Sequence, residues 1–118
     1  SHRAIAIRLW LEGKEPVAIA KHIKHSIKAV ENYLQKFQRV AFLKGRHFND
    51  YEIALTVGIS VYATKTFSEL YEEYKNKAFF KQRLEEINIV GSQYYVAQDE
   101  KKSILPSKDS TNNGRRKP

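Results

Sequence analysis

Basic side chains crowd one short stretch of the chain, "AIAKHIKHSIKAVENYL", residues 18–34. They surround a break at Lys24-His25-Ser26 in an otherwise helical pattern of apolar residues. Residues 1–48 hold ten Lys and Arg against three Asp and Glu, whereas residues 49–98 hold five against seven and residues 99–118 six against three. A basic surface that gathers around one segment favours a polyanion as the partner.

Other kinds of chemistry find little support in the residues. His22 and His25 stand three apart, but the chain has no cysteine and no evident third ligand beside them, so we expect no metal and no cofactor. No Gly-rich phosphate loop is present, and no nucleophile stands with a recognisable base, so we expect neither an enzyme nor a small-molecule substrate. The glutamates are expected on solvated helix faces: Glu69, Glu72, Glu73, Glu85 and Glu86.

The chain is expected to work away from the membrane. No apolar run approaches the ~20 residues that span a bilayer, and cysteine is absent, which suits a reducing compartment. We therefore expect a cytoplasmic protein, associated with the nucleoid if the source is prokaryotic. Because the chain lacks Met and opens directly into an apolar periodic segment, we interpret it as a piece of a longer protein.

The spacing of apolar residues predicts helices that would position the basic side chains. One covers residues 3–12, a second runs from Pro16 to about residue 23, and a third begins after Ser26, whose hydroxyl suits an N-cap. The core face of the third helix is expected to carry Ile27, Val30, Tyr33, Leu34 and Phe37.

The same pattern then recurs at an offset of 34 residues, so that residues 19–37 align with residues 53–71. Such a repeat implies one supersecondary unit used twice. "NDYE", residues 49–52, predicts a capping box at the start of a helix in the second copy. The aligned pairs are Ile19 with Ile53, Ala20 with Ala54, Ile23 with Val57, Ser26 with Ser60, Val30 with Thr64, Tyr33 with Phe67 and Phe37 with Tyr71.

Residues 61–89 continue without Gly or Pro, as one long helix or as two broken near residues 75–77. Gly91-Ser92 then predicts a turn, and "QYYVA", residues 93–97, a short extended piece. From residue 99 onward polar residues replace apolar ones, which predicts a disordered basic tail over residues 99–118.

The repeated unit resembles the helix-turn-helix family of DNA-binding units, with Ala20 in the first helix and Val30 in the second. The second copy matches the pattern at Ala54, Gly58, Ile59 and Phe67. Two residues depart from it: Lys24 stands where the family has its turn glycine, and Thr64 stands at an apolar position. The tandem arrangement, with "EEYK" after the second unit, also resembles a poorly characterised prokaryotic domain-of-unknown-function family over about residues 1–90.

The resemblance implies an all-α fold with two tandem helix-turn-helix units of three-helix type, at residues 1–44 and 45–75. A C-terminal helix with a short extension would follow at residues 76–98. The implied function is binding of double-stranded DNA, as a transcriptional regulator or as the DNA-recognition part of a mobile-element protein.

The helix after Ser26 would then enter the major groove. The expected base contacts are Ser26, Lys28, Ala29, Asn32 and Gln35. The expected phosphate contacts are Lys21, Lys24, His25, Lys36 and Arg39. Weaker contacts are expected from the second unit through Ser60, Tyr62, Lys65 and Thr66.

The rival hypothesis is a helical protein–protein interaction module that does not bind DNA. The acidic balance of residues 49–98 favours it, and the two helix pairs with residues 61–89 would then bind a protein. A homodimer through residues 61–89 is also expected beside the DNA-binding function. Four aromatic residues belong either to the core or to such a dimer seam: Tyr71, Tyr74, Phe79 and Phe80.

Overall fold

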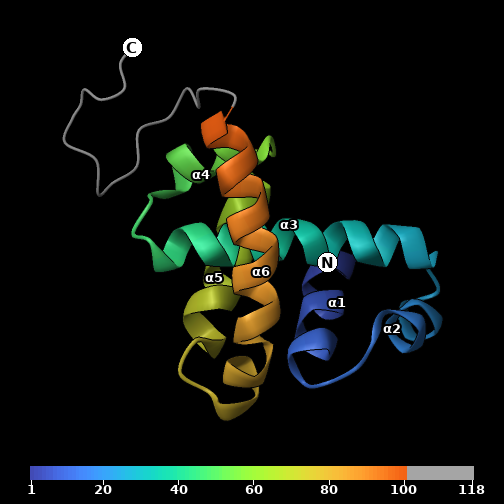
Figure 1. The fold of residues 1–118 in the computed structure, drawn as a ribbon. Helices are drawn as coiled ribbons and strands as arrows, with labels where there is room; N and C mark the ends of the chain where they lie inside the picture. Colours follow the sequence, from blue (N-terminus) through green and yellow to red (C-terminus); the bar gives the residue numbers. More distant parts are fainter. Residues whose placement is uncertain (101–118) are drawn as a thin grey trace.

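The described part of the chain is built from helices. The computed structural model describes the backbone of residues 1–100 and the side chains of residues 1–94. Within that range there are six helices and no strand, which confirms the all-α fold (Figure 1). The helices are α1 (His2–Leu11), α2 (Pro16–Ile23), α3 (Ile27–Gly45), α4 (Asp50–Val57), α5 (Val61–Tyr74) and α6 (Ala78–Glu100). None of the described helices is long and apolar enough to cross a membrane.

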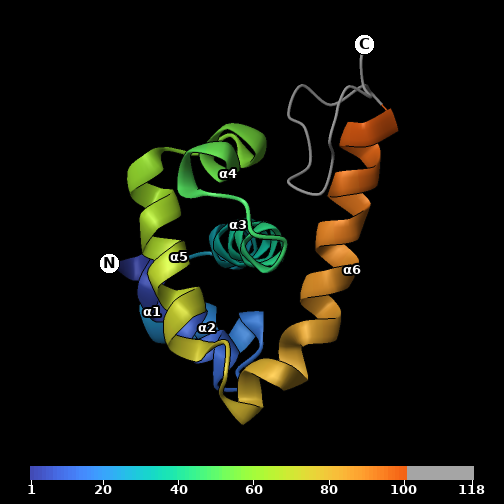
Figure 2. The same cartoon turned by 90° about the vertical axis from the view of Figure 1, so that its left-hand side faces the viewer.

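The long helix α3 is the centre of the arrangement. It packs against each of the five other helices. Figure 2 views α3 from its end, with α5 on one side of it, α4 above it and α6 on the other side. The pair α2–α3 is called the first helix pair below, and the pair α4–α5 the second helix pair.

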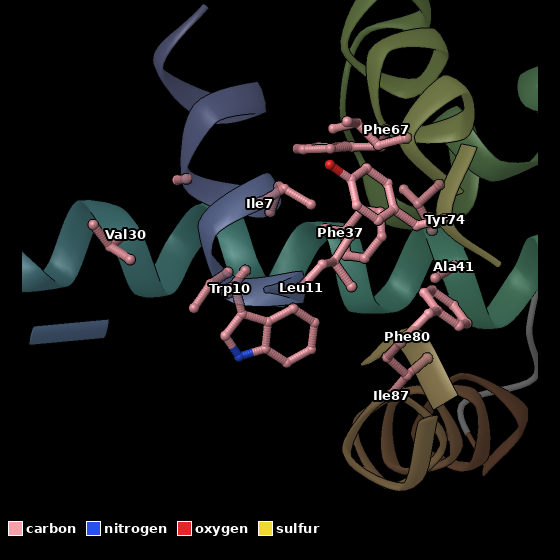
Figure 3. Close-up of a cluster of buried hydrophobic side chains, with 14 of the residues drawn as sticks. Ile7, Trp10, Leu11, Val30, Phe37, Ala41, Phe67, Tyr74, Phe80 and Ile87 are labelled. Carbon is pink, nitrogen blue, oxygen red and sulfur yellow. The ribbon is translucent and has the colours of Figure 1, made fainter. Parts of the chain in front are cut away.

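One hydrophobic cluster joins both helix pairs. Phe37 of α3 is fully buried and meets Trp10 of α1 edge-on, with ring centroids 6.4 Å apart. On its other side it meets Phe67 of α5 edge-on at 6.1 Å (Figure 3). Tyr74 and Phe80 are also buried in this cluster, between α5 and α6, so they belong to the core of the chain.

Side-chain caps start the helices where the sequence predicts them. The Ser26 hydroxyl accepts from the Ala29 amide at 3.0 Å at the start of α3. The predicted capping box of α4 is confirmed: the Asn49 side chain accepts from the Glu52 amide at 2.9 Å, and the Glu52 carboxylate accepts from the Asn49 amide at 3.0 Å.

The last helix differs from its prediction. The break near residues 75–77 is present, but α6 runs without interruption through residues 91–97, so the predicted turn and extended piece are wrong. Gly91 is buried against Phe42 of α3, and a methyl group in its place would collide with that ring. The glycine thus serves close helix packing. Helix α6 also includes residues 99 and 100 of the predicted tail, whose remainder lies outside the described residues.

A buried arginine fastens α6 to the end of α1. Arg83 is 7% exposed, and its guanidinium donates to the carbonyls of Trp10 and Lys14, both at 2.9 Å. It also forms ion pairs with Glu15 at 3.2 Å and Glu86 at 3.0 Å. The Trp10 carbonyl also accepts from the Gly13 amide at 3.0 Å, so Arg83 adds a second donor there, and its bond to the Lys14 carbonyl ties α6 to the segment that follows α1.

Candidate nucleic-acid interface

The turn of the first helix pair is tight and held by the backbone. Lys24 ends α2 in the left-handed conformation, with φ 59° and ψ 44°, and the His25 amide donates to the Ala20 carbonyl at 3.1 Å. Ser26 then returns to extended backbone and caps α3. The turn therefore bends without the glycine that the helix-turn-helix pattern has at this position.

The turn of the second helix pair has the same geometry. Gly58 takes φ 81° and ψ 37°, the Ile59 amide donates to the Ala54 carbonyl at 3.1 Å, and the Ser60 hydroxyl accepts from the Ala63 amide at 3.0 Å. Thr64, the second departure from the pattern, is fully buried with its hydroxyl donating to the Ser60 carbonyl at 2.9 Å. Its polar group is thereby satisfied, and the core accepts it.

One face of α3 is buried and the opposite face is open. Val30 and Leu34 turn into the core, as expected, whereas Ile27 is 44% exposed and does not belong to the core face predicted for it. Three predicted base contacts stand on the open face at intervals of four and three residues and are exposed: Lys28, Asn32 and Gln35. These three residues are called the reading stripe below.

The other two predicted base contacts flank the reading stripe. Ala29 is half-buried, and Ser26 is exposed with its hydroxyl engaged as the helix cap. An acidic side chain, Glu31, is exposed on the same open side of α3.

Cations surround the reading stripe. Lys21 and Lys24 are exposed and Lys36 is half-buried. Within the side chains that the structure describes, none of these three lysines has an ion-pair partner, and the same holds for Lys28. Their charges are therefore available to a polyanion, whereas a paired lysine would first have to leave its carboxylate.

Two predicted phosphate contacts are engaged inside the fold. The half-buried His25 ring lies 4.3 Å from that of His2, centroid to centroid, and its Nδ1 is 3.5 Å from the Tyr33 hydroxyl. The half-buried Arg39 guanidinium lies 3.8 Å over the Tyr94 ring and donates to the Thr56 carbonyl at 3.4 Å. Burial lowers the pKa of Arg39, and Tyr94 opposes that shift.

The second helix pair presents a different surface at equivalent positions. Tyr62 is 76% exposed and Leu55 60%, where the first pair has Lys28 and Lys21. Tyr51 is 67% exposed beside them, with the Lys65 ammonium 6.0 Å from its ring. The remaining predicted contacts of this pair are engaged locally, Ser60 as a cap and Thr66 by donating to the Tyr62 carbonyl at 3.3 Å.

The sequence prediction did not single out Tyr51 and Leu55, although a signal for both was present. They align with Val17 and Lys21 across the repeat, and the 34-residue offset places them on the outer face of α4. Within the described residues, no group of three or more His, Asp or Glu side chains is arranged to hold a metal ion.

Comparison with known proteins places the chain in a family. Residues 1–74 match the family described as "protein of unknown function (DUF1670)". The chain belongs to the DUF1670 family. No curated protein and no solved structure matches it.

The DUF1670 match ends at the last residue of α5. It includes both helix pairs and the whole of α3, so the two turns and the reading stripe are features of the matched region. Helix α6 lies beyond it. The resemblance to an uncharacterised family is thus confirmed, over a shorter range than the residues 1–90 expected.

Proposed function

We propose that this DUF1670 protein binds double-stranded DNA, with the amino-terminal half of α3 in the major groove and the two helix pairs acting as helix-turn-helix units. The observation that carries the proposal is the reading stripe: Lys28, Asn32 and Gln35 are exposed opposite the buried side of α3, among lysines that pair with none of the described carboxylates. The stripe supplies amides that can bond base edges, and the lysines supply cations that can meet phosphates.

The chemistry of the stripe fits base edges. The major groove admits one α-helix, and a second helix braces it from outside. Asn32 and Gln35 can each bond an adenine edge with both amide atoms, Lys28 suits guanine or phosphate, and Ala29 suits a thymine methyl. Ser26 adds a contact at the entry to the helix.

The surrounding cations supply affinity without reading sequence. Lys21, Lys24 and Lys36 would neutralise phosphates and release counterions, so the binding constant should fall steeply with salt. His25 and Arg39 contribute less in this proposal, because their side chains are held within the fold.

The biological role follows the same proposal. A chain that reads DNA in this way would act as a transcriptional regulator or as the DNA-recognition part of a mobile-element protein, in the cytoplasm and at the nucleoid of a prokaryote. The proposal assigns it binding and no catalysis.

Fluorescence anisotropy with a random duplex of ~30 base pairs, at two salt concentrations, tests the proposal. We expect binding that weakens as salt rises. Asn32→Ala should reduce the preference for one selected sequence over others, whereas Lys24→Ala should weaken binding to all sequences alike. Absence of binding at low salt, or binding that ignores salt, contradicts the proposal.

A second candidate function is suggested by the exposed apolar side chains of the second helix pair. Tyr51, Leu55 and Tyr62 form a surface better suited to protein than to phosphate, and we propose a second copy of the chain as its partner. Sedimentation at rising concentration should then detect a dimer that Tyr62→Ser abolishes. Lys28→Ser, the equivalent change in the first pair, should leave the dimer intact, and a strictly monomeric wild type rules this function out.

A further inference from the structure

The face of α3 that carries the reading stripe continues along the helix beyond Gln35. Continuing its intervals of four and three residues along the same helix leads to Arg39, Phe42 and Arg46. Two of these three side chains are cations, so the geometric continuation is as basic as the stripe itself. A duplex lying along α3 would meet them next.

Helix α6 occupies this continuation. Figure 1 shows α6 crossing α3, while the amino-terminal half of α3 extends beyond it. Phe42 packs against Gly91 of α6, and the Arg46 guanidinium lies 5.4 Å from the Phe42 ring. The Arg39 guanidinium, the one nearest to Gln35, lies flat at 3.8 Å over the Tyr94 ring of α6.

We infer that Tyr94 withholds Arg39 from bound DNA, so that α6 limits the affinity of the reading helix through a side-chain contact. This inference rests on the proposed DNA-binding function. Arg39 lies one helical turn from Gln35, within the reach of an arginine to the next phosphate, but its charge faces an aromatic ring.

The contact between Arg39 and Tyr94 is weak enough for a DNA phosphate to compete with it. A cation over an aromatic ring at a partly exposed site is a weak interaction, and the hydrogen bond from the guanidinium to the Thr56 carbonyl is long, at 3.4 Å. By contrast, Phe80, Ile87 and Arg83 are buried and hold the body of α6 in place. Release therefore concerns the Arg39 side chain, while α6 stays docked.

Tyr94→Ala in the full chain, compared with Tyr94→Phe, tests the inference. Without the ring, Arg39 is released, and we expect ~3- to 10-fold tighter binding to a ~30-base-pair duplex at low salt. The plot of log K against log salt should steepen by about 0.9, the value of one added phosphate contact. Tyr94→Phe keeps the ring and should behave as the wild type.

Further variants separate the possible outcomes. Tyr94→Leu keeps apolar bulk and should also bind more tightly, which covers the case in which Tyr94→Ala disturbs α6. Adding Arg39→Gln to either variant should abolish the gain. Wild-type binding with no gain in either variant overturns the inference alone, whereas absence of wild-type binding at low salt overturns the proposed function and the inference with it.

Discussion

Lys24 occupies a backbone conformation that L-residues with side chains adopt at a cost. Its φ of 59° matches the 81° of Gly58 at the equivalent point of the second turn. In left-handed backbone a Cβ crowds the following carbonyl, a penalty that glycine escapes. The backbone of the first turn is thus strained where that of the second is not, and the strained residue has an exposed, positively charged side chain.

Lys24→Gly should therefore raise stability while it lowers DNA affinity. We expect a gain of about 0.5–1 kcal/mol in the free energy of unfolding, seen as a rise of several degrees in the thermal midpoint. Gly58→Ala is the reciprocal control: nothing lies within 4 Å of the added carbon, so its loss of stability reports the backbone alone. A drop in stability for Lys24→Gly would contradict this account.

Arg83 is the other residue whose single side chain has consequences beyond its helix. Replacing it with Met removes the Arg83 donor from the Lys14 carbonyl and one of two donors from the Trp10 carbonyl, for which we expect a loss of about 1–3 kcal/mol in urea unfolding. Arg83→Lys should retain part of the stability, since one ammonium group cannot make all the hydrogen bonds that the planar guanidinium makes. The exposed neighbour Lys81→Met should change little, and equal losses for the two Met variants would argue against the buried network.

At the scale of elements, local chemistry predicts where helices begin better than where they end. Ser26, Asn49 and Ser60 announce the starts of α3, α4 and α5, because each cap is a short-range bond between neighbours in sequence. Gly91 misleads, because glycine serves both turns and close helix contacts. Only the position of Phe42, almost fifty residues earlier, decides between the two.

Gly91→Ala should consequently loosen α6 from α3. The added methyl group collides with Phe42, and overpacking of this kind costs about 1–3 kcal/mol. The measurement is a double-mutant cycle with Phe42→Gly, which removes both the ring and the Cβ that obstruct the added methyl group. Gly91→Ala should cost less stability in the Phe42→Gly background than in the wild type, and additive losses would show that the two positions act independently.

An ion pair ties α1 to α5 and makes stability depend on pH. The Arg8 guanidinium, 2.7 Å from the Glu73 carboxylate, lowers the pKa of that carboxyl by hydrogen bonding. A lowered folded-state pKa means that the contribution is present above the unfolded value of about 4.3 and is lost as pH falls through the folded pKa. Both side chains are half-exposed, so the effect is small and sensitive to salt.

Wild type and Glu73→Gln should accordingly differ most in urea midpoint at pH 5–7 and converge near pH ~3. Glu69→Gln, at an exposed carboxylate with no ion pair among the described residues, should follow the wild type at every pH. A Glu73→Gln difference that persisted unchanged into acid would mean that the pair contributes through packing and not through charge.

Across the whole molecule, periodicity predicted much of the candidate site and long-range packing decided the rest. The exposure of Lys28, Asn32 and Gln35 follows from the 3.6-residue period once the buried face is known. The surroundings of Arg39 depend on Tyr94, 55 positions later in the chain, and no local pattern announces such a contact. The prediction that Ile27 lies on the core face was wrong for a related reason: Ile27 stands in the first turn of α3 and is left exposed there.

Phe37 should make the molecule unfold as one unit. It is fully buried and its ring contacts both Trp10 and Phe67, so Phe37→Ala should cost about 3–5 kcal/mol. Phe37→Leu is the milder variant to use if that loss exceeds the total free energy of unfolding of the protein. In both, fluorescence of Trp10, the chain's only tryptophan, and far-UV circular dichroism should lose structure at the same denaturant concentration. Separated transitions would mean that the two helix pairs unfold independently.

Because α3 runs unbroken from the first turn to Gly45, with residues 46–49 between it and α4, the orientation of the second helix pair relative to the first turn depends on the number of residues in α3. Adding one residue in the middle of α3 would turn everything after it by about 100° and advance it by about 1.5 Å. Both turns would survive such an insertion, yet their outer surfaces would face new directions. Between Ser26 and Asn49, substitutions should therefore preserve the relative orientation of the two helix pairs far better than insertions or deletions, because the number of residues there sets that orientation.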